Sequence, residues 1–421
     1  MKKNTWIPAF AGMTMGIFGL LCSAYNPSFA QDEKISGGFE AFGNIVAGAG
    51  WQHHRIKGAV TSTVARDVNG TIPGPIGAYS QAITINREDE FKFFLDQFEL
   101  DLAKSFGENI RIRGDLDFGS GTLNSGPRFA NATGVGGQGS NVIVEQAYAT
   151  ANFLGAEFLL GRFNVPIGFE KVDVIYNFTI SRSEIYRALR PNTFTGAKVY
   201  YAFSDLVDWH VYASNNGSLA YDNGGLLPAG GFQNTDIPAF GTRLGFNWGE
   251  EGKRSTFGFS GVVGQDHPNG KTHISFLGDI DWQWWISDVF AFGGEGIYRQ
   301  IDTTSFTPGQ RKNGKYFGGL ANFHWLLSDV FNLNLRYAYT NDANGPSNAG
   351  VLVVPITSTT GTPSQSLTGA RQQIHEAALD GQYAIAEGAY FRVELDYNYI
   401  GPQFNASQQI FGVAGVLAYE F

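Results

Sequence analysis

The chain is 421 residues long, and its composition is unusual for a globular protein. Glycine supplies 55 residues, nearly twice the roughly 7 % share typical of globular proteins, and aromatic residues make up 14 % against only 16 % charged residues. The formal net charge of −9 argues against a generally basic nucleic-acid-binding protein, and the 43 % hydrophobic content argues against a disordered chain.

The first thirty residues predict a secretory signal peptide. Two lysines near the start precede an apolar stretch at 15–21, and Ser28 and Ala30 place small side chains just before a cleavage position. Basic, apolar and small residues in this order are typical of export signals. We therefore expect residues 1–30 to be removed and residues 31–421 to form the exported chain.

Beyond residue 30 the sequence has no apolar run of 18 or more residues, so no segment is predicted to cross a bilayer as a helix. A chain that spans a membrane without helices has to pair its backbone groups in a closed β-barrel. Apolar and polar residues do alternate with the period of a strand, since Phe98, Leu100 and Leu102 alternate with Glu99 and Asp101. The same alternation returns at 110–118, 331–339 and 391–399.

In chain order, this pattern predicts sixteen strands, at 35–52, 91–106, 109–119, 141–152, 155–163, 194–204, 206–215, 238–249, 254–264, 272–285, 289–299, 314–326, 329–340, 371–384, 389–399 and 408–421. Seven short turns alternate with eight longer loops, a pattern that a soluble sandwich has no reason to keep. Bacterial barrels place short turns in the periplasm and long loops outside. The predicted fold is therefore an all-β, antiparallel transmembrane β-barrel of about 16 strands with short periplasmic turns and long extracellular loops.

The polar side of each predicted strand faces the inside of the barrel in this interpretation. Twelve acids and six bases fall on that side, a net charge of −6 that favours cations weakly. The predicted inward residues are Glu99, Asp101, Arg111, Arg113, Asp115, Asp117, Asp208, Arg243, Asp279, Asp281, Glu295, Arg299, Arg336, Glu376, Asp380, Arg392, Glu394 and Asp396.

The last predicted strand ends on an aromatic residue, with Tyr419 and Phe421 on its apolar side. This ending resembles the C-terminal signal by which the bacterial outer-membrane assembly machinery recognises its clients. The resemblance implies that Tyr419 and Phe421 form an assembly signal and that this machinery is a partner.

The sequence also resembles the bacterial outer-membrane porins, most of all the OmpL-like β-barrel porin family. The matching stretch runs from Leu160 to Glu170 (LGRFNVPIGFE), continues at 177–183 (NFTISRS), and ends with Pro191 and the pair Thr195-Gly196. The resemblance implies an outer-membrane channel. A weaker similarity to phosphate-selective porins lacks the lysine-rich ladder that anion selectivity would imply.

The connection 164–193 is the candidate constriction. It is the third long loop, and in the general porins that this chain resembles that loop folds inward and narrows the lumen. The charged residues predicted to act there are Glu170, Lys171, Arg182, Arg187 and Arg190. The alternative is an outside loop that contacts lipopolysaccharide or a neighbouring subunit.

Three functions remain open from the sequence: a passive diffusion porin for small hydrophilic solutes and ions, a channel selective for sugars or organic acids, and a non-conducting structural or adhesive barrel. We expect no enzyme activity, no cofactor, no metal site and no nucleic-acid partner. The expected partners are outer-membrane lipid and lipopolysaccharide. Porins of this kind are often trimers, so a homotrimer is one alternative that the sequence does not decide.

Overall fold

The computed structural model describes eleven stretches of the chain, namely residues 39–57, 62–65, 80–83, 87–119, 142–215, 238–250, 252–266, 273–304, 311–342, 372–403 and 406–421. The predicted signal peptide at residues 1–30 lies outside the described residues. Among the described residues, no helix is both long enough and apolar enough to cross a bilayer.

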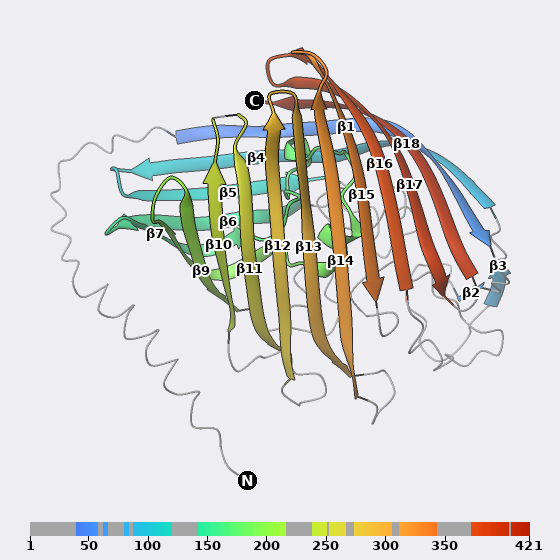
Figure 1. The fold of residues 1–421 in the computed structure, drawn as a ribbon, viewed down its shortest axis with the longest axis horizontal. Coiled ribbons are helices and arrows are strands. Elements are labelled where there is room, and N and C mark those ends of the chain that lie inside the picture. Colours follow the sequence, from blue (N-terminus) through green and yellow to red (C-terminus); the bar gives the residue numbers. More distant parts are fainter. Residues whose placement is uncertain are drawn as a thin grey trace, which may run out of the picture. The chain divides into compact units, whose positions relative to one another are not determined.

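Sixteen antiparallel strands form one closed barrel in the described part of the chain (Figure 1). Each strand pairs with its neighbours in sequence, and β1 closes the barrel by pairing with β18. The barrel strands are β1 (Phe39–Lys57), β4 (Arg87–Phe106), β5 (Ile110–Phe118), β6 (Val142–Phe153), β7 (Ala156–Asn164), β8 (Thr193–Ala202), β9 (Val207–Ser214), β10 (Ala239–Trp248), β11 (Ser255–Asp266), β12 (His273–Ser287), β13 (Phe290–Thr304), β14 (Arg311–Leu326), β15 (Phe331–Asp342), β16 (Gln372–Ala386), β17 (Ala389–Gln403) and β18 (Ala406–Glu420).

The predicted antiparallel β-barrel of about 16 strands is confirmed, because each of the sixteen predicted strands corresponds to one barrel strand. The lengths and sides of the turns and loops stay predictions. Two short strands were not predicted. Strands β2 (Ser62–Ala65) and β3 (Ser80–Ile83) form a small two-stranded antiparallel sheet inside the stretch 53–90, for which the alternation predicts a loop. The two strands have four residues each, too few to give a clear period-two pattern.

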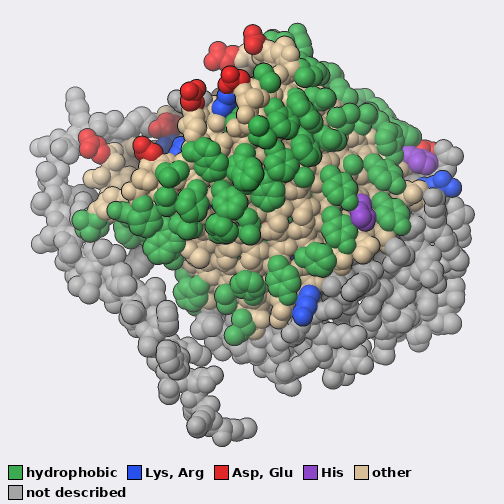
Figure 2. All heavy atoms as spheres, viewed as in Figure 1, with side chains coloured by type: hydrophobic (Ala, Val, Ile, Leu, Met, Phe, Trp, Pro, Cys, Tyr) green, Lys and Arg blue, Asp and Glu red, His purple; other side chains and the backbone are tan. Residues whose placement is uncertain are grey.

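Side chains alternate between the outer and inner faces of the wall. On β12, Ile274, Phe276 and Ile280 are 67 %, 44 % and 41 % exposed, whereas Leu277 and Asp279 between them are buried. Hydrophobic side chains accordingly cover much of the described outer surface turned to the viewer in Figure 2. Lipid tails can solvate such a surface, while water cannot, so this face fits a barrel that crosses a membrane.

The seam that closes the barrel includes the last residue of the chain. The backbone N–H of Gly43 donates to the carbonyl oxygen of Phe421 at 2.9 Å, and the N–H of Phe421 donates back to Gly43 at 2.9 Å. The rings of Tyr419 and Phe421 stack 6.2 Å apart and are about half exposed, at 48 % and 47 %. The two predicted signal residues therefore lie together on the outer face of the seam.

Candidate pore constriction

Segment 164–193, which connects β7 to β8, lies inside the barrel (Figure 1). Its side chains and backbone contact inner-wall residues of strands as far apart as β4, β13 and β17. Most of the segment is irregular, apart from a 3-10 turn at Val174–Tyr176 and a π-helical turn at Ile185–Leu189. Irregular backbone at this position needs partners for its N–H and C=O groups, from the barrel or from water.

One side of the segment is apolar and packs on an apolar part of the inner wall. Val165, Ile167, Ile185 and Leu189 of the segment are all less than 10 % exposed. They form one cluster with inward side chains of β7 to β15, which are Leu159, Phe163, Phe194, Tyr212, Ala239, Val262, Leu277, Ile297, Tyr316, Leu320 and Ala338. Removing these groups from water stabilises the inward position of the segment.

Two glycines allow the segment to approach the wall closely. A Cβ atom on Gly318 of β14 would lie 2.7 Å from Ile185 Cγ1 and 3.0 Å from Leu189 Cδ1. Gly168 of the segment itself has a φ of +82°, a left-handed conformation that side chains disfavour, and a Cβ there would meet Arg190 and Glu295. Substitution at either position should therefore displace the segment.

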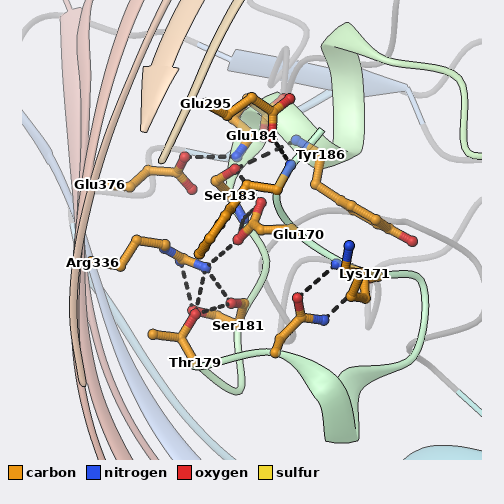
Figure 3. A network of polar contacts seen from close by, with 12 residues as sticks. Glu170, Lys171, Thr179, Ser181, Ser183, Glu184, Tyr186, Glu295, Arg336 and Glu376 are labelled. Carbon is orange, nitrogen blue, oxygen red and sulfur yellow. Dashed lines mark hydrogen bonds and ion pairs between the residues drawn. The ribbon is translucent and has the colours of Figure 1, made fainter. Parts of the chain in front are cut away.

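The other side of the segment is held by a buried ion pair (Figure 3). Arg336 Nη1 of β15 lies 2.8 Å from Glu170 Oε1, and the two side chains are 3 % and 4 % exposed. Arg336 also donates to the hydroxyl oxygens of Thr179 and Ser181, each at 2.9 Å, and to the carbonyl oxygen of Ser181. Glu170 in turn accepts from the N–H of Ser183 at 3.0 Å and from its hydroxyl at 2.5 Å. Arg336 of the wall thus contacts the segment at three residues, Glu170, Thr179 and Ser181.

Wall carboxylates accept hydrogen bonds from the irregular backbone. The N–H of Phe169 donates to Glu295 of β13 at 2.9 Å and that of Glu184 donates to Glu376 of β16 at 2.6 Å. On β17, Glu394 accepts from the N–H of Ser181 at 3.1 and 3.0 Å. These acids had been predicted to face the lumen, and each of them holds the backbone of the segment.

Two of the predicted constriction arginines stack on one tyrosine. The guanidinium carbons of Arg182 and Arg190 lie 4.8 and 4.6 Å from the centre of the Tyr186 ring. Tyr186 is 1 % exposed, and this burial raises the pKa of its hydroxyl to about 12, so the ring stays neutral. Arg190 further donates to the carbonyl oxygens of Ile167 and Glu170.

The remaining predicted constriction residues differ in what the structure shows of them. Lys171 is exposed, while its backbone N–H donates to the side-chain oxygen of Asn177 at 2.7 Å. The side chain of Arg187 lies outside the described residues, although its backbone forms part of the π-helical turn.

Strands β4 to β6 carry a dense group of carboxylates beside the segment. Glu99, Asp101, Asp115 and Asp117 of β4 and β5 are each no more than 5 % exposed. The group also contains Asp96, Glu145 and Asp173, and we call these seven residues the acidic corner. Two bases lie against it. Arg113 contacts Asp115 at 2.7 Å and Asp101 at 3.2 Å, and Arg182 interacts electrostatically with Asp96, Asp117 and Asp173.

The other predicted inward residues form local pairs around the wall. Arg243 pairs with Asp281, and Arg392 pairs with Asp380 at 3.2 Å. Arg111 pairs with Glu40 at 2.7 Å, and its side chain is 43 % exposed, more than that of Arg243 or Arg392. The remaining contacts are Asp208 with Asn247, Asp396 with Asn398, Asp279 with Glu295, and Arg299 with the carbonyl oxygen of Leu189.

Sequence reasoning missed several residues of this site. Asp96 and Glu145 lie where the pairing register shifts, between β1 and β4 and between β5 and β6 respectively. A β-bulge adds one residue to a strand, so two successive side chains turn to the same face and the period of two is broken. Glu145 and Gln146 are neighbours of this kind, since both accept hydrogen bonds from Asn164. The sequence signal that could have indicated each bulge is a pair of adjacent polar residues, Asp96 with Gln97 and Glu145 with Gln146.

The structure and the comparisons with known proteins first define a class, an outer-membrane β-barrel of the porin type. The model of the family described as "Putative beta-barrel porin-2, OmpL-like" matches residues 67–418, and the chain belongs to that family. The predicted family is thus confirmed. None of the curated proteins matches the sequence.

Solved porin structures share the fold. The outer-membrane channel DcaP of Acinetobacter baumannii is 12 % identical with a TM-score of 0.58, and the alignment covers 93 % of this chain and 99 % of that one. An anion-selective porin from Comamonas acidovorans is 10 % identical with a TM-score of 0.53, covering 92 % and 100 %. OprB of Pseudomonas putida is 12 % identical with a TM-score of 0.50, covering 91 % and 94 %. These similarities establish the barrel fold alone.

Proposed function

We propose that the protein is a diffusion porin that lets small hydrophilic solutes and ions cross the outer membrane. The single observation that carries this proposal is the course of segment 164–193, which is anchored inside a sixteen-strand barrel. A barrel of this size encloses more space than its own side chains fill. An internal segment then narrows the passage and sets the size and charge of the solutes that pass.

We further propose a weak preference for cations. The acidic corner brings seven carboxyl groups against two arginines, an excess of acidic groups over basic groups beside the segment. Charges of one sign in a narrow section favour the passage of ions of the opposite sign. Because screening is substantial beyond about 8 Å at physiological ionic strength, only charges near the narrow section contribute strongly.

Recording from the refolded protein in a planar bilayer, with a KCl gradient across it, tests this function. We expect large, stable single-channel steps and a zero-current potential displaced towards that of a cation-selective pore. Replacing Asp115 and Asp117 with Asn should move this potential towards anions, because Arg113 then loses the carboxylate 2.7 Å away. Steps with an anion bias would overturn the cation preference and leave the porin function intact.

Deleting residues 182–190 tests the role of the segment itself. Its loss removes the π-helical turn and the contacts of Arg190, so the conductance should rise. An unchanged conductance would remove the constriction role. No steps at all from a correctly folded barrel would favour a structural or adhesive barrel instead.

Assembly and partners complete the proposal. The position of Tyr419 and Phe421 on the outer face of the seam supports their recognition by the outer-membrane assembly machinery. The apolar outer surface supports contact with membrane lipid and lipopolysaccharide, and trimers of the barrel would use part of the same surface.

A further inference from the structure

The acidic corner contains three carboxylates that converge on one point. Glu99 of β4, Glu145 of β6 and Asp173 of the inner segment each offer an oxygen, and these oxygens all lie within 4.8 Å of one another. Glu99 and Glu145 are 1 % exposed. Water can therefore do little to screen the repulsion between these carboxylates, and another group has to offset it.

Buried oxygens without a hydrogen-bond donor are a second, separate feature of this place. Among the described residues, Glu99 Oε1 and Glu145 Oε2 accept no hydrogen bond, and neither does the neutral amide oxygen Asn44 Oδ1. Asn44 is 2 % exposed, and its amide points into the corner, because its Nδ2 lies 2.5 Å from Glu99 Oε2. Buried polar atoms almost always have a partner, so unpartnered oxygens on Glu99, on Glu145 and on the amide that donates to Glu99 indicate a bound group.

The bases of the corner do not fill this role. Arg113 is engaged by Asp115 and Asp101 on the neighbouring side. Arg182 stacks on Tyr186 and spreads its charge over Asp96, Asp117 and Asp173. The charges that act most strongly on Glu99 are those of four other carboxylates, Asp173, Glu145, Asp101 and Asp117, and all of them repel it.

We propose that Glu99, Glu145 and Asp173 bind a hard divalent cation of the Ca²⁺ type, with Asn44 supplying a neutral oxygen beside them. Ca²⁺ binds oxygen ligands at about 2.3–2.6 Å, so two ligand oxygens of one ion are at most about 5 Å apart, as the three carboxylates are. The site contains neither sulfur nor imidazole, which softer metals prefer.

Such an ion joins the inner segment to the wall. Asp173 belongs to the segment, whereas Glu99 and Glu145 belong to strands β4 and β6. The same point of the segment is also held by Gln97, which accepts from the N–H of Val174 at 2.9 Å and donates to Asp173 at 3.2 Å. The cation would therefore add a fixed connection between the segment and the wall at strands β4 and β6, where the contacts are polar and not apolar. This inference concerns ion binding and does not depend on conduction.

The test uses the full exported chain, refolded in detergent without lipid and stripped of metal with a chelator. Calorimetric titration with Ca²⁺ should give one saturable site, and Ca²⁺ should raise the temperature at which the strands unfold. Glu145→Gln keeps the size of the side chain and should weaken binding by on the order of 10-fold or more. The matched control is Asp208→Asn on β9, an inner-wall acid outside the corner, which should bind Ca²⁺ as the parent does.

Two results would overturn the proposal. One is the absence of saturable Ca²⁺ binding at millimolar concentration, which would mean that protons shared between the carboxylates offset the charge. The other is equal binding by the parent and Glu145→Gln. If Glu145→Gln does not refold, Asp173→Asn replaces it, since Asp173 lies on the segment and not in a strand. Loss of binding in Asp173→Asn supports the proposal, and retention overturns the connection between segment and wall.

Discussion

The inner segment meets the barrel wall in two different ways. Towards β7–β15, Ile185 and Leu189 pack into an apolar cluster. Towards β4–β6 and β15–β17, Glu170 and Asp173 meet arginines, carboxylates and amides. The apolar side depends on shape and on removal of water, whereas the polar side depends on charges that each need a specific partner. We therefore expect substitutions on the apolar side to lower the stability of the protein by moderate amounts. On the polar side, we expect a single substitution to be enough for a large loss of stability.

The largest effect should come from the buried ion pair. Arg336→Met keeps most of the side-chain volume but leaves Glu170 charged, buried and without its cation. Breaking such a pair costs about 3–5 kcal/mol. We expect this loss in the free energy of unfolding measured in urea, together with a higher and noisier single-channel conductance.

A double variant and an exposed pair serve as controls for that prediction. Arg336→Met combined with Glu170→Gln should recover part of the lost stability, because the unpaired charge is removed. Arg111→Ala breaks an exposed pair with Glu40 and should cost no more than about 1 kcal/mol. Equal losses for Arg336→Met and Arg111→Ala would contradict the distinction between a buried polar anchor and surface charge.

The next largest effect should come from the apolar side. Gly318→Val places methyl groups where Ile185 Cγ1 is already 2.7 Å from a Cβ position. Overpacking of this kind typically costs about 1–3 kcal/mol. Gly296→Val on β13 is the matched control, since a Cβ there meets nothing within 4 Å. Urea unfolding should separate the two, and similar midpoints would mean that the segment moves aside without cost.

The fold and the polar part of the site could be predicted from the sequence for a physical reason. Strands in a membrane barrel have one face in lipid and one towards the lumen, so polarity repeats every second residue. Arg336 and Glu394 followed directly from that rule, and the structure places both against the segment.

The apolar half of the site could not be predicted in this way. Leu277, Ile297 and Leu320 point inward, yet their polarity is that of lipid-facing residues. These side chains belong to one buried cluster with Ile185 and Leu189, and that cluster joins positions far apart in the sequence. The bulge at Glu145 is a second case, because one extra residue reverses the alternation beyond it.

A smaller effect is expected from pH on the polar side. Burial raises the pKa of Asp173 above the ordinary carboxyl value, so the protonated form is favoured when the segment is in place. A raised folded-state pKa gives stability at low pH that is lost as the pH rises through that pKa. In the presence of a chelator, the urea midpoint should therefore fall with rising pH in the parent, and less in Asp173→Asn. If the urea midpoints of the parent and of Asp173→Asn change with pH in parallel, the surroundings of Asp173 do not raise its pKa.

The smallest effect should come from the charge of Lys171. Lys171 is exposed, and its backbone is fixed by Asn177 through bonds that a change of side chain leaves intact. Lys171→Gln should therefore leave the urea midpoint unchanged and displace the zero-current potential slightly towards cations. Since the Debye length is about 8 Å at 0.15 M and about 30 Å at 0.01 M ionic strength, the displacement should grow as the salt is diluted. A displacement that does not depend on salt would mean that the substitution of Lys171 moves the segment. The polar contacts between segment and wall would then hold the segment less firmly than their distances indicate.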